Sequence, residues 1–220
     1  GRWSEFFEQQ NEGGKRLASI CHTRPSGAFF GLAQLSPFTR NSKAWKDLMA
    51  LPSIEDRVNA LRNETTRAKL IAEGIEAGDM KNLAHMLHPF GIDSKPNLDF
   101  ARQQSLLQLA EAEGKDPVEV YVERLLASEG REFFNFWMFG GNLDNQWKYM
   151  QLPHVVPMLG DAGAHVGFFT DTDSPTVLLS ELTREQGVYS LPEAVHRITG
   201  KSAAIIGLKE RGELREGWHA

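Results

Sequence analysis

Apolar residues recur at helical spacing over most of the chain. Residues 2–12 place Trp3, Phe6 and Phe7 on one face, and Gly13 with Gly14 ends that segment. Later segments repeat the pattern and begin or end at Ser, Asp-Pro or Gly, which are residues that cap or stop helices. The pattern predicts helices over 2–12, 43–49, 54–62, 64–77, 102–113, 117–129, 143–150, 176–184, 193–199 and 202–206.

Three short apolar runs, at 16–21, 133–139 and 155–159, indicate strands. The last contains the β-branched Val155 and Val156, which suit a strand covered on both faces. The middle run is aromatic, and it either fills the core or lines a pocket. Because helices separate the three strands, the order predicts an α/β fold with a parallel sheet. Three strands are too few to close an eight-stranded barrel.

The segment after the third strand carries the strongest signal of chemistry. Gly160, Gly163 and Gly167 interrupt the regular pattern and allow tight turns around Asp161 and His165. These two residues are predicted at the carboxyl end of a strand, where α/β folds build active sites. The alternative is that Asp161 only forms a turn or caps a helix.

Arg24 is a second candidate, because it follows the first predicted strand in the turn-forming stretch His22-Thr-Arg-Pro-Ser-Gly27. Its planar guanidinium could clamp the carboxylate of a substrate, or it could pair with a neighbouring acid of the chain. Asp171 and Asp173 form a second acidic pair. Without further ligands in this stretch, they predict a capped loop before the helix at 176 rather than a metal site.

Composition excludes several classes of function. The 220 residues carry a formal net charge of -5, so no basic surface indicates nucleic-acid binding. No apolar run approaches the roughly 18 residues of a membrane span, and the N-terminus lacks the apolar core of a signal peptide. The single cysteine, Cys21, excludes an internal disulfide and predicts a buried structural thiol in a reducing, cytoplasmic compartment.

The segment Gly160-Asp-Ala-Gly-Ala-His-Val-Gly167 resembles the D-aminoacylase branch of the metal-dependent amidohydrolases, the N-acyl-D-amino-acid deacylases. The resemblance continues through Leu191-Pro-Glu-Ala-Val-His-Arg-Ile-Thr199 and the closing stretch from Gly207 to Ala220. Upstream, Arg24-Pro-Ser-Gly27 and Leu51-Pro52 are also similar to this family. The resemblance covers most of the chain, although 79–100 does not contribute to it.

The resemblance implies a TIM-type barrel with a zinc site at the carboxyl ends of its strands. Asp161 matches the aspartate that ends the last strand, touches the metal and carries a proton to the leaving amine. His165 and Arg24 are then expected to face the substrate, a small N-acyl amino acid. Nucleic acid and membrane are not expected partners.

The chain departs from the family because none of its seven histidines has the His-x-His spacing of the first barrel strand. The resemblance therefore implies that 1–220 is the carboxyl-terminal portion of the barrel, with a mainly helical insertion over about 36–130. One aspartate cannot hold a catalytic zinc, which usually needs three protein ligands. The chain alone is expected to be inactive and to associate with the missing barrel half or with a second copy.

Two alternatives remain open. The chain could be a non-catalytic α/β ligand-binding or interaction module on an amidohydrolase scaffold that lacks the metal. It could also belong to an amidohydrolase that acts on a cyclic amide or another acyl-amine.

Overall fold

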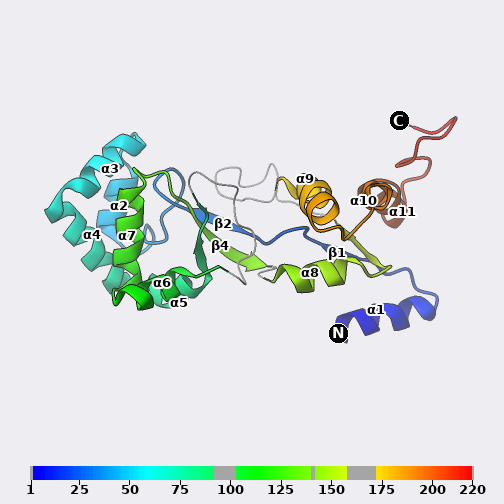
Figure 1. Cartoon of the computed structure of the whole chain (residues 1–220), viewed down its shortest axis with the longest axis horizontal. Helices are drawn as coiled ribbons and strands as arrows, with labels where there is room; N and C mark the ends of the chain where they lie inside the picture. Colours follow the sequence, from blue (N-terminus) through cyan, green and yellow to red (C-terminus); the bar gives the residue numbers. More distant parts are fainter. Residues whose placement is uncertain (1, 92–102, 140–141, 158–171, 220) are drawn as a thin grey trace. The chain divides into compact units, whose positions relative to one another are not determined.

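The computed structural model is a mixed α/β structure, as predicted (Figure 1), and it describes residues 2–91, 103–139, 142–157 and 172–219. Asp161 and His165 lie outside these residues. The described chain forms two compact units, one from 2–25, 142–157 and 172–219, and the other from 26–91 and 103–139. No helix within these ranges has both the length and the apolar character needed to cross a membrane.

A parallel pair of strands organises the first unit. β1 (Ser19–Cys21) pairs with β5 (Val155–Pro157), and the register joins Ser19 to Val155 and Cys21 to Pro157. One helix, α8, packs against both strands, and α10 packs against β5. Figure 1 shows these helices approaching the pair from different sides. The helices of this unit are α1 (Arg2–Glu12), α8 (Leu143–Met150), α9 (Ser174–Val177), the π-helix η3 (Leu178–Glu185), α10 (Leu191–Ile198) and α11 (Gly200–Ile205).

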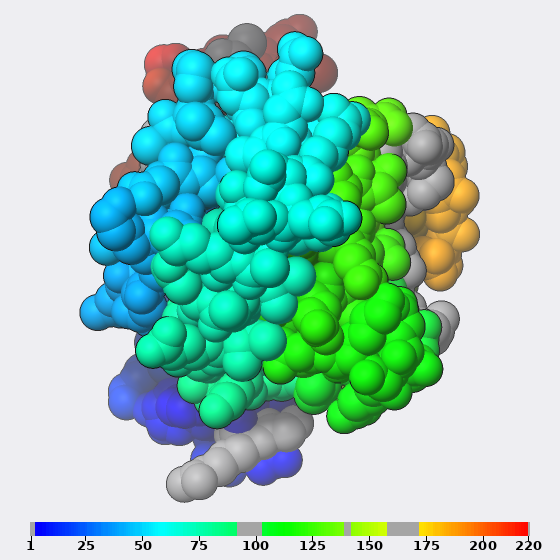
Figure 2. All heavy atoms as spheres, turned by 90° about the vertical axis from the view of Figure 1, so that its left-hand side faces the viewer, coloured from blue at the N-terminus to red at the C-terminus, as the bar shows by residue number. Residues whose placement is uncertain are grey.

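The second unit combines an antiparallel sheet with a group of helices. Strand β4 (Phe134–Phe139) lies between β2 (Ser26–Phe30) and β3 (Leu87–Pro89). Figure 2 shows the helical side of this unit, where α3, α4 and α7 pack against one another. Its helices are α2 (Lys43–Met49), α3 (Ile54–Arg62), α4 (Glu64–Ala77), α5 (Asp79–Leu83), the 3-10 helix η1 (Ala84–Met86), α6 (Leu106–Glu113) and α7 (Pro117–Ala127).

A cluster of aromatic side chains fills the core of the second unit. Trp45 of α2 and Tyr121 of α7 are fully buried, and their rings contact Phe38 at centroid distances of 4.7 and 5.7 Å. Phe134 reaches the same cluster from the sheet, 4.6 Å from Tyr121. Phe134, the first residue of β4, therefore belongs to the core. A place in the core was one of the two roles predicted for the aromatic run at 133–139.

The helix ends confirm several predicted caps. The Ser42 hydroxyl accepts a hydrogen bond from the Trp45 backbone N–H at the start of α2. Asp116 caps α7 in a capping box, with Pro117 at the first helical position. Gly78 ends α4 with a φ of 72°, in the left-handed region that favours glycine. These ends follow from local chemistry, which is why the sequence alone located them.

The prediction that the three strands form one parallel sheet is wrong. Strands β1 and β5 are parallel, but β4 pairs antiparallel with β2 and β3. The two partners of β4 escaped prediction because β3 has three residues, one of them Pro89, and β2 begins at an irregular step between Ser26 and Gly27. Neither sheet closes on itself among the described strands.

Several predicted helix boundaries also require correction, and α10 and α11, for example, each begin two residues before the predicted start. The helix predicted from 102 begins at Leu106, because Ser105 is its N-cap and forms a capping box with Gln108. The helix predicted over 176–184 begins earlier, at Ser174, and continues as a π-helix through Glu185. The described part of 36–130 contains α2 to α7, η1 and β3. Its assignment as a barrel insertion stays a prediction.

Gly27 is required for the close approach of β2 to β4. A Cβ atom at this position would lie 1.9 Å from the Phe136 carbonyl oxygen, and neither backbone can move without breaking the ladder. We expect Gly27→Ala to lower the free energy of unfolding of this unit by about 1–3 kcal/mol, the usual cost of overpacking. Urea unfolding measures the change.

The matched control is Gly13→Ala, because the nearest atoms to a Cβ there are 3.4 Å away, an ordinary contact. Equal effects of the two substitutions would contradict this account of the β2–β4 contact.

Candidate functional site

The carboxyl ends of β1 and β5 lie at the same edge of the parallel pair. His22, Thr23 and Arg24 follow β1 directly, and 158–171 follows β5 in the sequence. Asp161 and His165 belong to that second segment, so their positions lie outside the described residues. The candidate site therefore consists of the described residues at this edge. In α/β folds, ligands bind at the carboxyl ends of parallel strands.

Arg24 is held at this edge by an ion pair. Its side chain is only 3% exposed, and Nη1 donates to both carboxylate oxygens of Asp173 at 2.9 Å. Asp173 is 45% exposed, so the pair meets solvent through the acid rather than through the arginine. Pairing with an acid was one of the two predicted interpretations of Arg24. Its contact with a substrate stays a prediction.

A second contact joins the same two segments beside the ion pair. The buried Thr23 hydroxyl donates to the Ser174 carbonyl oxygen at 2.8 Å and lies 2.8 Å from the Ser174 hydroxyl. Asp173 occupies the N-cap position of α9, but its side chain makes no capping hydrogen bond there. Its carboxylate pairs with Arg24 instead, which corrects the predicted capping role for Asp173, whereas Asp171 lies outside the described residues.

Helix α8 contributes polar groups that the sequence did not single out. Gln146 Nε2 donates to the carbonyl oxygens of His22 and Arg24, the latter at 3.2 Å, and Trp147 Nε1 lies 3.4 Å from that of Thr23. Gln146 is buried. The prediction missed Gln146 because a glutamine on an amphipathic helix belongs to no motif. Only the tertiary structure places it against Arg24, which lies 122 residues earlier in the chain.

Cys21 is the last residue of β1, and its thiol is expected to be unreactive. Burial raises the pKa of its thiol to about 11, against a smaller lowering effect of a hydrogen bond with Gln146. The thiol is therefore protonated at neutral pH, and a protonated thiol is a poor nucleophile and a poor metal ligand. The unreactive thiol agrees with the predicted structural role, but Cys21 is half-buried and not fully buried as predicted.

The described residues do not fit a zinc site by themselves. Within 2–91, 103–139, 142–157 and 172–219, no group of three or more His, Cys, Asp or Glu side chains is close enough together to hold a metal ion. Catalytic zinc usually needs three protein ligands. Any metal centre must draw ligands from beyond these residues, so no catalytic step through a metal follows from this structure.

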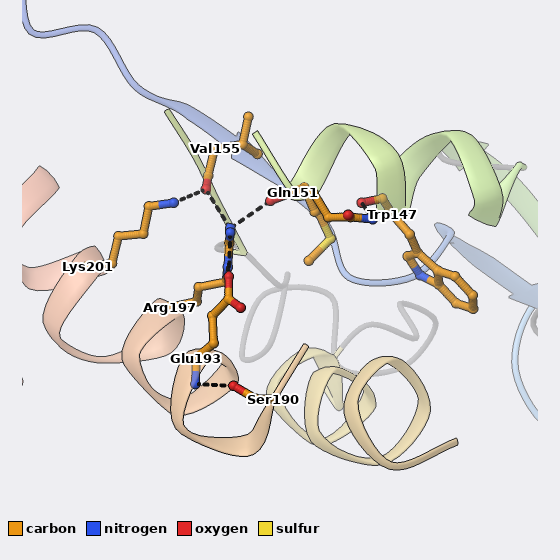
Figure 3. Close-up of polar contacts among 8 residues, drawn as sticks. Trp147, Gln151, Val155, Ser190, Glu193, Arg197 and Lys201 are labelled. Carbon is orange, nitrogen blue, oxygen red and sulfur yellow. Dashed lines mark hydrogen bonds and ion pairs between the residues drawn. The ribbon is translucent and has the colours of Figure 1, made fainter. Parts of the chain in front are cut away.

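The opposite end of β5 carries a different polar cluster (Figure 3). The buried Arg197 of α10 donates to the carbonyl oxygen of Met150 at 2.7 Å, and its Nη1 lies 3.4 Å from that of Val155. It also pairs with Glu193, and Lys201 donates to the Val155 carbonyl at 3.0 Å. Val155 is the first residue of β5, so the cluster lies at the amino end of the strand. In barrels and α/β sheets this end serves stability.

A cavity of about 620 Å³ lies between α10 and the closing segment of the chain. Leu191, Val195 and Leu214 give it mainly apolar walls, and His196 and His219 supply polar atoms. Neither Arg24 nor Asp173 lines it, so the predicted site and this cavity are separate features.

Part of the chain is similar to a deacylase of N-acyl-D-amino acids. The relative is the N-acyl-D-aspartate deacylase of Alcaligenes xylosoxydans xylosoxydans, which is 51% identical over 45 residues. The match covers 20% of this chain and 9% of the relative, so the chain accounts for only a small part of that protein. No protein-family profile matches the chain. The predicted resemblance to the N-acyl-D-amino-acid deacylases is confirmed.

Two solved structures also have partial similarity. A D-aminoacylase with a binuclear metal centre is 22% identical, with a TM-score of 0.33, and the match covers 63% of this chain and 27% of that one. The N-acyl-D-glutamate deacylase of Bordetella bronchiseptica, complexed with zinc and a phosphonate inhibitor, is 20% identical, with a TM-score of 0.36. That match covers 72% of this chain and 35% of the other.

Proposed function

We propose that this chain is the carboxyl-terminal part of a longer, zinc-dependent amidohydrolase that cleaves the amide bond of N-acyl-D-amino acids. The observation that carries the proposal is the 51% identity over 45 residues with an N-acyl-D-aspartate deacylase. The substrate class follows from the name of that relative. The proposed compartment is the cytoplasm, in line with the single cysteine of the chain.

The proposed roles of this chain's residues centre on the carboxyl edge of β1 and β5. Asp161 is proposed to contact the zinc and to move a proton to the leaving amine, which is the ordinary work of a positioned carboxylate. His165 and Arg24 are proposed to face the substrate. The Arg24 guanidinium lies at this edge in its ion pair with Asp173, and a guanidinium suits the carboxylate of an N-acyl amino acid.

We also propose that the chain forms the last strands of a TIM-type barrel and that 36–130 is an insertion in it. The zinc ligands other than Asp161 are proposed to come from earlier strands. Among the described residues the sheet of β1 and β5 has two strands, and open strand edges favour pairing with another segment. Association with the missing barrel half, or with a second copy, would cover them.

The test uses the complete protein that contains this sequence. We expect it to release free amine from N-acetyl-D-aspartate, to lose activity with a chelator, and to regain it with zinc. Asp161→Ala should lower kcat by at least about 100-fold, the lower limit for loss of general acid–base catalysis. Asp47→Ala, at an exposed acid that pairs with Lys43, is the control. Full turnover by Asp161→Ala would contradict the assigned role, and absence of hydrolysis would favour the non-catalytic module.

A further inference from the structure

Two adjacent side chains of α8 bind three consecutive carbonyl groups beyond the end of β1. Gln146 Nε2 donates to the carbonyl oxygens of His22 and Arg24, and Trp147 Nε1 approaches that of Thr23 at 3.4 Å. These carbonyl groups follow the last ladder residue, Cys21, so the strand pair does not orient them. Helix α8 therefore helps to orient them, together with the contacts of Thr23 with Ser174 and of Arg24 with Asp173.

The backbone conformation at Arg24 determines the position of its guanidinium. Pro25 restricts Arg24 to extended conformations, and the carbonyl bound by Gln146 fixes the remaining rotation about its own peptide. The Arg24 side chain is buried along its length and meets Asp173 at the edge. A long side chain amplifies a small change of backbone direction, so a rotation at Arg24 would move the guanidinium away from the edge.

The orientation of the Gln146 amide follows from its neighbours. Its two contacts at this end are carbonyl oxygens, which only accept hydrogen bonds, so the NH₂ group and not the oxygen must face them. Gln146 is also buried, so water cannot easily replace it. The residue thus supplies two donors that no other part of α8 provides to His22 and Arg24.

We propose that Gln146 is a positioning residue for Arg24 and thereby determines how this edge recognises the carboxylate of its ligand. The inference rests on the proposed function, in which Arg24 binds the carboxylate of an N-acyl amino acid. Gln146 itself touches no substrate. It acts through the backbone that carries Arg24.

Two substitutions remove the donors in different ways. Gln146→Glu keeps the size but turns an oxygen toward two carbonyl oxygens, and Gln146→Met keeps the length without any polar atom. Gln151→Glu, at the C-cap of the same helix, is the matched control, because Gln151 is exposed and its amide donates to the Trp147 carbonyl at 3.4 Å. Thermal unfolding of each variant verifies that it folds.

The readout separates carboxylate recognition from general damage. In the complete protein, amine release is measured for N-acetyl-D-aspartate and for its dimethyl ester, which lacks the carboxylates. We expect Gln146→Glu and Gln146→Met to raise the KM for the acid by about tenfold or more relative to the ester, the scale of a small misplacement in a binding group. We expect kcat for the ester to stay within about threefold of the parent value. Arg24→Met should also lose the preference for the acid over the ester. The double variant Arg24→Met with Gln146→Met should lose no more of this preference than Arg24→Met alone.

The outcomes distinguish the inference from its premise. If Arg24→Met keeps the preference for the acid, carboxylate binding by Arg24 and the positioning role both fail. If Arg24→Met loses the preference while both Gln146 variants behave like Gln151→Glu, only the positioning role fails. An equal loss of acid and ester turnover in the folded Gln146 variants would also overturn it, since that is what a purely structural residue gives.

Discussion

Trp45→Ala is expected to destabilise the helical unit by about 3–5 kcal/mol, the cost of deleting a large buried aromatic side chain. Trp45 is fully buried, its Nε1 donates to the Leu70 carbonyl oxygen at 2.9 Å, and its ring contacts Phe38 and Tyr121. Gly74 lies against the same indole and has no side chain of its own to fill the space. Because a whole domain is stable by only about 5–15 kcal/mol, this loss should be visible as a lower urea midpoint.

The control is the same substitution on the surface. Trp3 of α1 is 72% exposed, and Trp3→Ala should change the free energy of unfolding by no more than about 0.5 kcal/mol. If Trp45→Ala and Trp3→Ala gave similar midpoints, the aromatic cluster would not be the core of its unit.

Arg197→Met is expected to destabilise the first unit by about 2–4 kcal/mol, because it removes several buried hydrogen bonds of one charged group. The Arg197 side chain is 7% exposed, and it joins the end of α8, the start of β5 and Glu193. Its guanidinium also lies over the Tyr189 ring, 4.5 Å from the centroid, a favourable cation–π geometry. Methionine keeps the apolar length but none of these contacts. Thermal unfolding followed by circular dichroism measures the effect.

Two further variants test the reason for this effect. Arg184→Met removes an arginine that is 72% exposed and pairs with its neighbour Glu185, and it should be nearly neutral. Arg197→Lys should lower the free energy of unfolding by an amount between those of Arg184→Met and Arg197→Met. A single ammonium cannot reproduce the planar guanidinium, which reaches two carbonyl groups and Glu193. A neutral Arg197→Met would show that the cluster in Figure 3 adds no stability.

Helices were predictable from the sequence where their ends carry local chemistry. Ser42, Asp116 and Gly78 cap or end helices with atoms only a few residues away, so the pattern around them was sufficient. Ser105 provides the same chemistry, but the polar stretch before it was counted into the helix, and the predicted start was early. Boundaries set by neighbours in the sequence are the part of the fold that patterns reveal.

Strand pairing was less predictable, because partners lie far apart in the chain. The aromatic run at 133–139 indicated a strand, but nothing in it distinguished parallel pairing from antiparallel pairing. The three residues of β3 are too few for a periodic signal. The alternation of helices and strands favoured a parallel sheet, and among the strands that the structure describes β1 and β5 form the parallel pair.

The candidate site shows the same division. The carboxyl end of β1 and the arginine beyond it followed from the pattern, and an acid partner for Arg24 was one of two predicted alternatives. The identity of that acid, Asp173, depends on the tertiary structure, because Arg24 and Asp173 are 149 positions apart in the sequence. Gln146 could not be found, because its importance depends on three carbonyl groups that α8 meets only in the folded unit.

Cys21 offers an internal reporter of opening at the end of β1. It is the sole cysteine of the chain, it is half-buried, and burial raises the pKa of its thiol to about 11, so the reactive thiolate is scarce at pH 7 while the strand is closed. Alkylation by a soluble maleimide would then proceed mainly through transient exposures of this strand end. The ratio of its rate to that of an unstructured thiol would measure the free energy of that local opening without any introduced label.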